Sequence, residues 1–199
     1  MNIKSFLAAS LLALGATGSA IAGPIPYPGG GENGTTYVFT ATTDGDITAY
    51  FMGTGAAYDE TLGLLVNGVD SGVTGLANHG PGIVVGSSLD FGAVHAGDVL
   101  TFYISVQNTG ATWYSNMALN ADASNHVYST DYAGGGGVPA GTYVGFEDLP
   151  AGGSDYNYFD ETFVFTNVST TPSVPEPGNV ALLLAGLGLL GAAARRRRG

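Results

Sequence analysis

Carboxylates are concentrated in one stretch of the chain, residues 145–161, which reads Gly-Phe-Glu-Asp-Leu-Pro-Ala-Gly-Gly-Ser-Asp-Tyr-Asn-Tyr-Phe-Asp-Glu. The stretch contains five acids and one asparagine, with no basic residue nearby. Hard oxygen ligands of this kind suit Ca²⁺, which takes about 6 to 8 oxygens and accepts backbone carbonyls from glycine-rich loops. The sequence therefore predicts a Ca²⁺ site with the ligands Glu147, Asp148, Asp155, Asn157 and Asp160.

Two alternatives use the same part of the chain. Asp and Asn are common turn formers and solubilising residues, and no EF-hand pattern is present, so a metal site has to be formed by the fold itself. Aromatic rings in loops can also stack on sugars while polar groups fix their orientation. The candidate aromatic contacts for such a carbohydrate-binding module are Trp113, Tyr114, Tyr156 and Tyr158.

The charge distribution decides which partners are possible. The five basic residues are Lys4 and the arginines at 195–198, so residues 23–174 contain no lysine or arginine but hold 15 of the 16 carboxylates. Such a region cannot neutralise phosphates, which argues against binding to nucleic acid. Carboxylates that folding brings together must be solvated, protonated, capped by N–H groups or bound to a cation.

Catalytic patterns are missing from the sequence. There is no cysteine, no G-x-S-x-G elbow and no H-E-x-x-H pair, and His79, His95 and His126 are isolated from one another. Paired carboxylates can serve a glycosidase, but no spacing singles out an acid and a nucleophile. We therefore expect no catalytic residues and no enzyme, with a secreted hydrolase as the least favoured alternative.

The elements that must position these residues are short strands between Gly, Asn and Asp clusters. Alternation is clearest at Leu100, Phe102, Ile104 and Val106, and we expect a long loop at 120–132. Many short strands without helical periodicity predict an all-β domain, an antiparallel β-sandwich or jelly roll. The predicted strands are residues 36–41, 47–52, 62–67, 82–85, 99–106, 113–119, 142–146 and 162–168.

Both ends of the chain have the composition of export signals. Residues 1–22 have Lys4, an apolar run and a small-residue site ending at Ala22, the pattern of a helical signal peptide. Residues 172–199 form a proline-rich linker, an apolar helix at 180–194 and four arginines. Fifteen helical residues span about 22 Å, short of a bilayer core of about 30 Å. This leaves 23–171 as the secreted domain, with a short transmembrane helix behind it.

The C-terminal stretch resembles the PEP-CTERM sorting signal of Gram-negative bacteria. The residues that carry the resemblance are Val174, Pro175, Glu176 and Pro177, followed by the apolar helix and Arg195, Arg196, Arg197 and Arg198. The resemblance implies cleavage near the Pro-Glu-Pro by an exosortase-like membrane transpeptidase. It also implies transient anchoring in the inner membrane and a final place at the cell surface or in the extracellular matrix, while the signal peptide at residues 1–22 predicts export through the Sec machinery and cleavage by signal peptidase.

A second resemblance covers the acidic stretch. Phe146, Glu147, Asp148, Asp155, Tyr158 and Asp160 match the motif of a domain of unknown function shared by PEP-CTERM proteins and large calcium-dependent adhesins, whereas Asn157 and Phe159 depart from it. This resemblance implies a structural or adhesive module stabilised by Ca²⁺. The alternative is a module that binds carbohydrate, with exopolysaccharide as its partner.

Overall fold

A computed structural model of the chain describes residues 25 and 27–173. These residues form eleven β-strands and one short 3₁₀ turn, η1 (Met117–Leu119). The predicted signal helix and the predicted C-terminal helix both lie outside the described residues. Within residues 25 and 27–173, no helical segment has both the length and the hydrophobicity of a membrane span.

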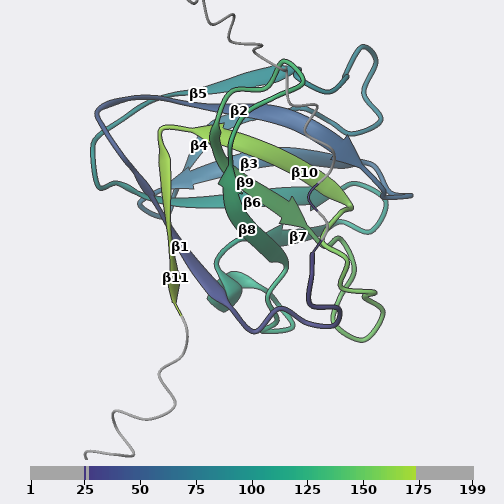
Figure 1. The fold of residues 1–199 in the computed structure, drawn as a ribbon. Coiled ribbons are helices and arrows are strands. Elements are labelled where there is room, and N and C mark those ends of the chain that lie inside the picture. Colours follow the sequence, from purple (N-terminus) through teal and green to yellow (C-terminus); the bar gives the residue numbers. More distant parts are fainter. Residues whose placement is uncertain (1–24, 26, 174–199) are drawn as a thin grey trace, which may run out of the picture.

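The strands form two antiparallel sheets (Figure 1). Sheet A has the order β11-β1-β6-β3-β4, with β7 also paired to β6, and sheet B has the order β5-β2-β10-β9-β8. The strands of sheet A are β1 (Thr36–Ala41), β3 (Glu60–Val66), β4 (Val69–Gly75), β6 (Val99–Val106), β7 (Ala111–Tyr114) and β11 (Val168–Ser173). Those of sheet B are β2 (Gly45–Thr54), β5 (Ser88–Val94), β8 (Val127–Tyr132), β9 (Gly141–Phe146) and β10 (Glu161–Thr166).

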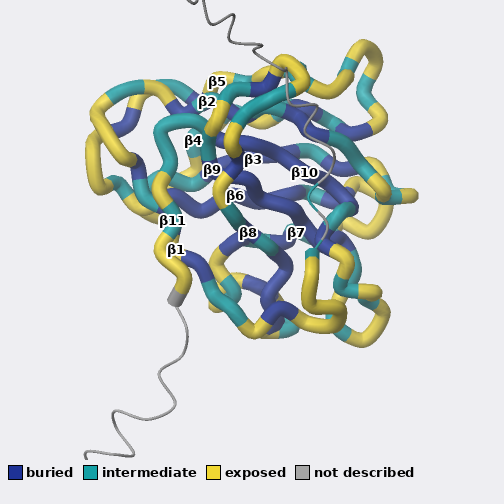
Figure 2. Tube along the Cα trace, viewed as in Figure 1, coloured by how far each residue is buried: buried dark blue, intermediate teal, exposed yellow. Residues whose placement is uncertain are grey.

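The hydrophobic core lies between the two sheets. Phe102 of β6 stacks on Phe165 of β10 with ring centroids 3.8 Å apart, so the inner faces of sheets A and B are in direct contact. The alternation predicted in β6 is confirmed, because Leu100, Phe102, Ile104 and Val106 are all buried. Figure 2 shows this buried layer as dark blue strands inside exposed loops. The fold is thus all-β with two packed antiparallel sheets, whereas a jelly-roll connectivity stays a prediction.

Several predicted elements were wrong in detail. Residues 82–85 are a turn and not a strand, and the strand predicted at 113–119 ends at Tyr114, before η1. Asn116 caps η1 by accepting a hydrogen bond from the Ala118 N–H at 3.1 Å. Strand β8 forms the last part of the predicted loop 120–132. Strands β4 and β5 were missed because both contain glycine and aspartate, which indicate turns, and β4 is also mostly exposed.

The last strand extends past the predicted domain boundary. Pro172 pairs with Tyr37 in register, and β11 continues to Ser173 instead of ending at residue 171. Strand β11 lies at the edge of sheet A, with β1 as its hydrogen-bonded neighbour. Proline has no N–H to donate to a neighbouring strand, and it is tolerated at the edge of a sheet, where a strand has a neighbour on one side only. Pro172, which the sequence assigns to the linker, is thus a residue of β11.

Candidate metal centre

The acidic loop 147–160 connects β9 to β10, the light-green segment of Figure 1. Its two ends are held together because Phe146 and Glu161 are directly paired in the sheet. The Asp160 N–H donates to the Phe146 carbonyl at 3.1 Å, and the Asp148 N–H donates to Asp160 Oδ2 at 2.9 Å. Strand pairing thus brings acids from the start and the end of the loop to one place.

Three of the five predicted ligands lie together at this place. Glu147, Asp148 and Asp160 each offer a carboxylate oxygen within 4.8 Å of the others. Their exposed fractions are 1%, 5% and 9%. Glu147 Oε1 accepts a hydrogen bond from the Leu149 N–H at 3.2 Å, whereas its Oε2 is buried without a hydrogen-bond partner. A buried carboxylate oxygen in this state is one that a cation would satisfy.

The other two predicted ligands do not join this group. Asp155 and Asn157 are exposed, and their side chains make hydrogen bonds within the loop. Asp155 Oδ1 accepts from the Asn157 N–H at 3.0 Å, and Asn157 Oδ1 accepts from the Phe159 N–H at 2.7 Å. These are the Asx-turn contacts expected of turn formers. The turn interpretation therefore describes Asp155 and Asn157, while the metal hypothesis rests on the other three.

Two further acids adjoin the group, and the sequence reasoning did not select them. Glu60 of β3 and Glu161 of β10 are both completely buried. The carboxyl group of Asp148 is a neighbour of the Glu60 carboxyl, and Glu60 also lies in the electrostatic field of Glu161 and Asp160. The sequence does contain an indication that both glutamates are buried. Each stands at an alternate strand position whose next two members are buried apolar residues: Glu60-Leu62-Leu64 and Glu161-Phe163-Phe165.

Burial dominates the electrostatics of the cluster. Loss of solvation, the adjacent Asp148 carboxyl and the other neighbouring acids raise the pKa of Glu60 to about 10. Loss of solvation and the charges nearby raise the pKa of Asp160 to about 7, despite its bond from the Asp148 N–H. Burial also raises the pKa of Glu147, and it raises that of Glu161 well above its usual value. With no lysine or arginine in residues 23–174, these carboxyls need either protons or a cation.

Two stacked aromatic side chains, Trp113 and His126, contact the backbone at the start of the acidic loop. Trp113 Nε1 donates to the Asp148 carbonyl at 2.6 Å, and the indole stacks on His126 with ring centroids 3.9 Å apart. His126 Nδ1 lies 2.9 Å from the Glu147 carbonyl oxygen, and its Nε2 lies 3.1 Å from Asp122 Oδ2. Trp113 and His126 thus hold the backbone carbonyls of Asp148 and Glu147, the first two acids of the loop.

The four aromatic residues expected to contact glycan do not form one exposed platform. Trp113 and Tyr158 are buried, at 5% and 1% exposure, so both are part of the packing and not of the surface. Tyr114 is half-buried beside Tyr103, and Tyr156 is half-buried with its hydroxyl donating to the Ala151 carbonyl. Trp113 and Tyr158, which the sequence placed in or beside loops, are therefore packed in the interior. Binding of exopolysaccharide stays a prediction.

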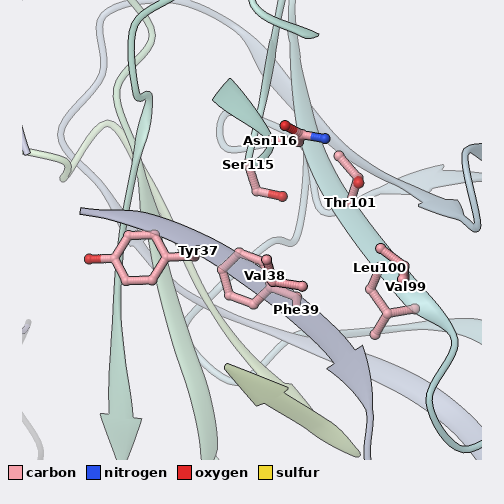
Figure 3. A pocket seen from close by; sticks show the side chains of 8 residues that line it. All are labelled: Tyr37, Val38, Phe39, Val99, Leu100, Thr101, Ser115 and Asn116. Carbon is pink, nitrogen blue, oxygen red and sulfur yellow. The ribbon is translucent and has the colours of Figure 1, made fainter. Parts of the chain in front are cut away.

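A surface pocket lies away from the acidic cluster, where β1 and β6 separate (Figure 3). These strands pair only at Phe39–Leu100 and Thr40–Val99, and beyond this point the Ser115 N–H donates to the Phe102 carbonyl of β6 at 2.8 Å. The Phe102 N–H donates to Ser115 Oγ at 3.0 Å. Lining residues are Tyr37, Val38, Phe39, Val99, Leu100, Thr101, Ser115 and Asn116. The pocket therefore offers no carboxylate or histidine for acid–base chemistry.

Comparison with known proteins finds a match for the C-terminal tail but none for the β-sandwich domain. The profile of the PEP-CTERM protein-sorting motif matches residues 173–198. No curated protein and no solved structure matches the chain. The resemblance to the adhesin-associated domain thus stays a prediction. The chain carries a PEP-CTERM protein-sorting motif, which implies export, a membrane-anchored C-terminus before cleavage and processing by an exosortase.

Proposed function

We propose that the protein is a non-catalytic structural or adhesive module of the cell surface or extracellular matrix, stabilised by Ca²⁺. It reaches this location through the Sec machinery and signal peptidase, and an exosortase-like transpeptidase then cleaves the tail near Pro175-Glu176-Pro177. The matched sorting motif supports the second step. The host expected for this route is a Gram-negative bacterium.

One observation carries the Ca²⁺ part of the proposal. Glu147, Asp148 and Asp160 gather their carboxylates within 4.8 Å, and the buried Glu147 Oε2 has no hydrogen-bond partner. Carboxylate clusters buried without a compensating charge are strongly unfavourable. Residues 23–174 supply no lysine or arginine, so the compensation must come from outside the chain or from protons. All-oxygen ligands favour Ca²⁺ over softer metals.

The test compares thermal unfolding of the full-length protein, purified in mild detergent, in Ca²⁺ and in chelator. A ligand that binds only the native state stabilises it by about 2.7 kcal/mol at 100 times Kd, which raises the Tm of a domain this size by roughly 5–10 °C. The variant Glu147→Gln is expected to lose most of this increase. Asp131→Asn, which changes an exposed acid on β8, should keep it.

An equal Tm in Ca²⁺ and in chelator would refute the metal part of the proposal. Addition of Mg²⁺ in place of Ca²⁺ tests selectivity, since Mg²⁺ demands octahedral geometry and retains its water ligands. A clearly smaller increase with Mg²⁺ is the expected result.

A further inference from the structure

Glu60 and Glu161 enter the sandwich interior from opposite sheets. Glu60 is the first residue of β3 in sheet A, and the same face of that strand buries Leu62 and Leu64. Glu161 is the first residue of β10 in sheet B, and the same face buries Phe163 and Phe165. Side chains on alternate strand positions share one face, so both carboxyls point between the sheets.

These two glutamates have more acceptor capacity than the protein satisfies. Both side chains are fully buried. Neither oxygen of Glu161 has a hydrogen-bond partner, and neither does Glu60 Oε1. Buried polar atoms in folded proteins are nearly always paired, so unpaired ones in one cluster indicate a missing ligand.

The orientation of Glu60 is fixed by Asn78. Asn78 Oδ1 accepts from the Glu60 N–H at 2.9 Å, and its Nδ2 donates to Glu60 Oε2 at 3.3 Å. The same amide lies 3.3 Å from Thr54 Oγ1, which donates to the Asp160 carbonyl. A chain of contacts thus runs from β3 through Asn78 and the end of β2 to the start of β10, and it positions Glu60 towards the acidic loop.

We propose that Glu60 and Glu161 complete the cation site formed by Glu147, Asp148 and Asp160, so that one bound divalent cation ties sheet A to sheet B. This inference rests on the proposed Ca²⁺ function and adds to it the ligands supplied by the strands. Three carboxylates with one oxygen each fall short of the 6 to 8 oxygens that Ca²⁺ takes, and the unpaired oxygens of the two glutamates supply the difference. The cation is thus expected to join the sheets and not merely to order a loop.

The decisive variants are Glu60→Gln and Glu161→Gln, which keep the shape of each side chain and remove its charge. Each is expected to weaken Ca²⁺ binding by about 10- to 100-fold in titration calorimetry of the full-length protein, the range found for changes around metal sites. In chelator, their Tm should equal or exceed that of the unchanged protein, because a neutral amide is easier to bury than a carboxylate. Asp131→Asn is the matched control and should bind as the unchanged protein does.

The two measurements together separate a ligand from a packing residue. A packing residue would lower the Tm in chelator and leave Ca²⁺ affinity unchanged, and that result would overturn the inference. Wild-type affinity in both glutamine variants would also overturn it, while the proposed Ca²⁺ function would stand. Absence of Ca²⁺ binding by the unchanged protein would instead refute the proposed function, and the inference with it.

Hydrogen exchange on the unchanged protein gives a result that does not depend on how the variants fold. Addition of Ca²⁺ should slow exchange at the start of β3 and around Asn78 as well as in residues 147–160. Protection confined to residues 147–160 would show that the cation orders the loop alone, and the inference would then be wrong.

Discussion

At the scale of single residues, the protein is distinguished by acids where apolar side chains are expected. Glu60 and Glu161 are completely buried, and Glu147, Asp148 and Asp160 are nearly so. Each isolated buried charge costs several kcal/mol, and residues 23–174 contain no lysine or arginine to offset it. The protonation of these carboxyls must therefore control the stability of the metal-free protein.

This gives a pH dependence of definite sign. Burial raises the pKa of Glu60 to about 10 and that of Asp160 to about 7, whereas both groups titrate near 4 in an unfolded chain. A raised native pKa contributes stability that is complete below the unfolded value and is lost as pH rises through the native value. In chelator, the Tm is therefore expected to fall from about pH 4 to about pH 10, and the contribution of Asp160 is lost by about pH 7.

The same scan in excess Ca²⁺ provides the contrast. The cation binds the ionised carboxylates, so the increase in Tm that it causes should grow with pH over this range. Calorimetric scans at several pH values, with and without chelator, measure both trends. A chelated protein that becomes more stable as pH rises would contradict the assignment of raised pKa values to these buried acids.

At the scale of elements, strand β9 and the acidic loop depend on one close approach. The β-carbon of an alanine at Gly145 would collide with the backbone oxygen of Tyr158. Tyr158 has a positive φ of 52° and packs its ring against Tyr27, so the loop has little freedom to move away. The absence of a side chain at Gly145 therefore lets the loop lie against β9 and bring Asp160 back to Asp148.

We expect Gly145→Ala to displace this loop and to destabilise the protein by about 1–3 kcal/mol, the usual range for forced overpacking. Ca²⁺ affinity should fall as well, because Asp160 would move from Glu147 and Asp148. The control is Gly152→Ala in the same loop, where nothing lies within 4 Å of an added β-carbon. Urea unfolding and titration calorimetry of both variants measure the effects, and equal behaviour of the two would contradict the role of Gly145.

At the scale of the whole molecule, charge separates the chain into parts with different tasks. The described sandwich contains acids and no lysine or arginine, while four of the five basic residues stand at 195–198, within the matched sorting motif. Positive residues beside an apolar segment favour the cytoplasmic side of a membrane. This arrangement leaves the acidic domain on the outer side during sorting, where divalent cations can reach it.

Replacement of Pro175, Glu176 and Pro177 by alanine is expected to block processing, since these residues form the core of the sorting motif. Uncleaved protein should then accumulate in the membrane fraction of the producing cells, as measured by fractionation and by the mass of the chain. Pro172→Ala, which lies in β11 and outside the matched residues, serves as the control and should be processed normally. Normal cleavage of the triple variant would refute exosortase recognition at this site.

The sequence by itself determined the features that depend on composition and on short-range pattern. Alternation in β6 is visible because strand side chains repeat every two residues, and the sorting motif is one continuous stretch. The absence of lysine and arginine from residues 23–174 likewise needs no structure, and it led to the prediction of a cation.

Only the tertiary structure decided which acids meet. Glu60 and Asp148 are distant in the chain and become neighbours because β3 and the β9–β10 loop belong to opposite sheets that pack together. Asp155 and Asn157, in the midst of the acidic stretch, use their oxygens on their own loop instead. Strand order and sheet packing are set by long-range contacts, so proximity in the sequence did not show that Asp155 and Asn157 lie apart from the other acids or that Glu60 and Glu161 are buried.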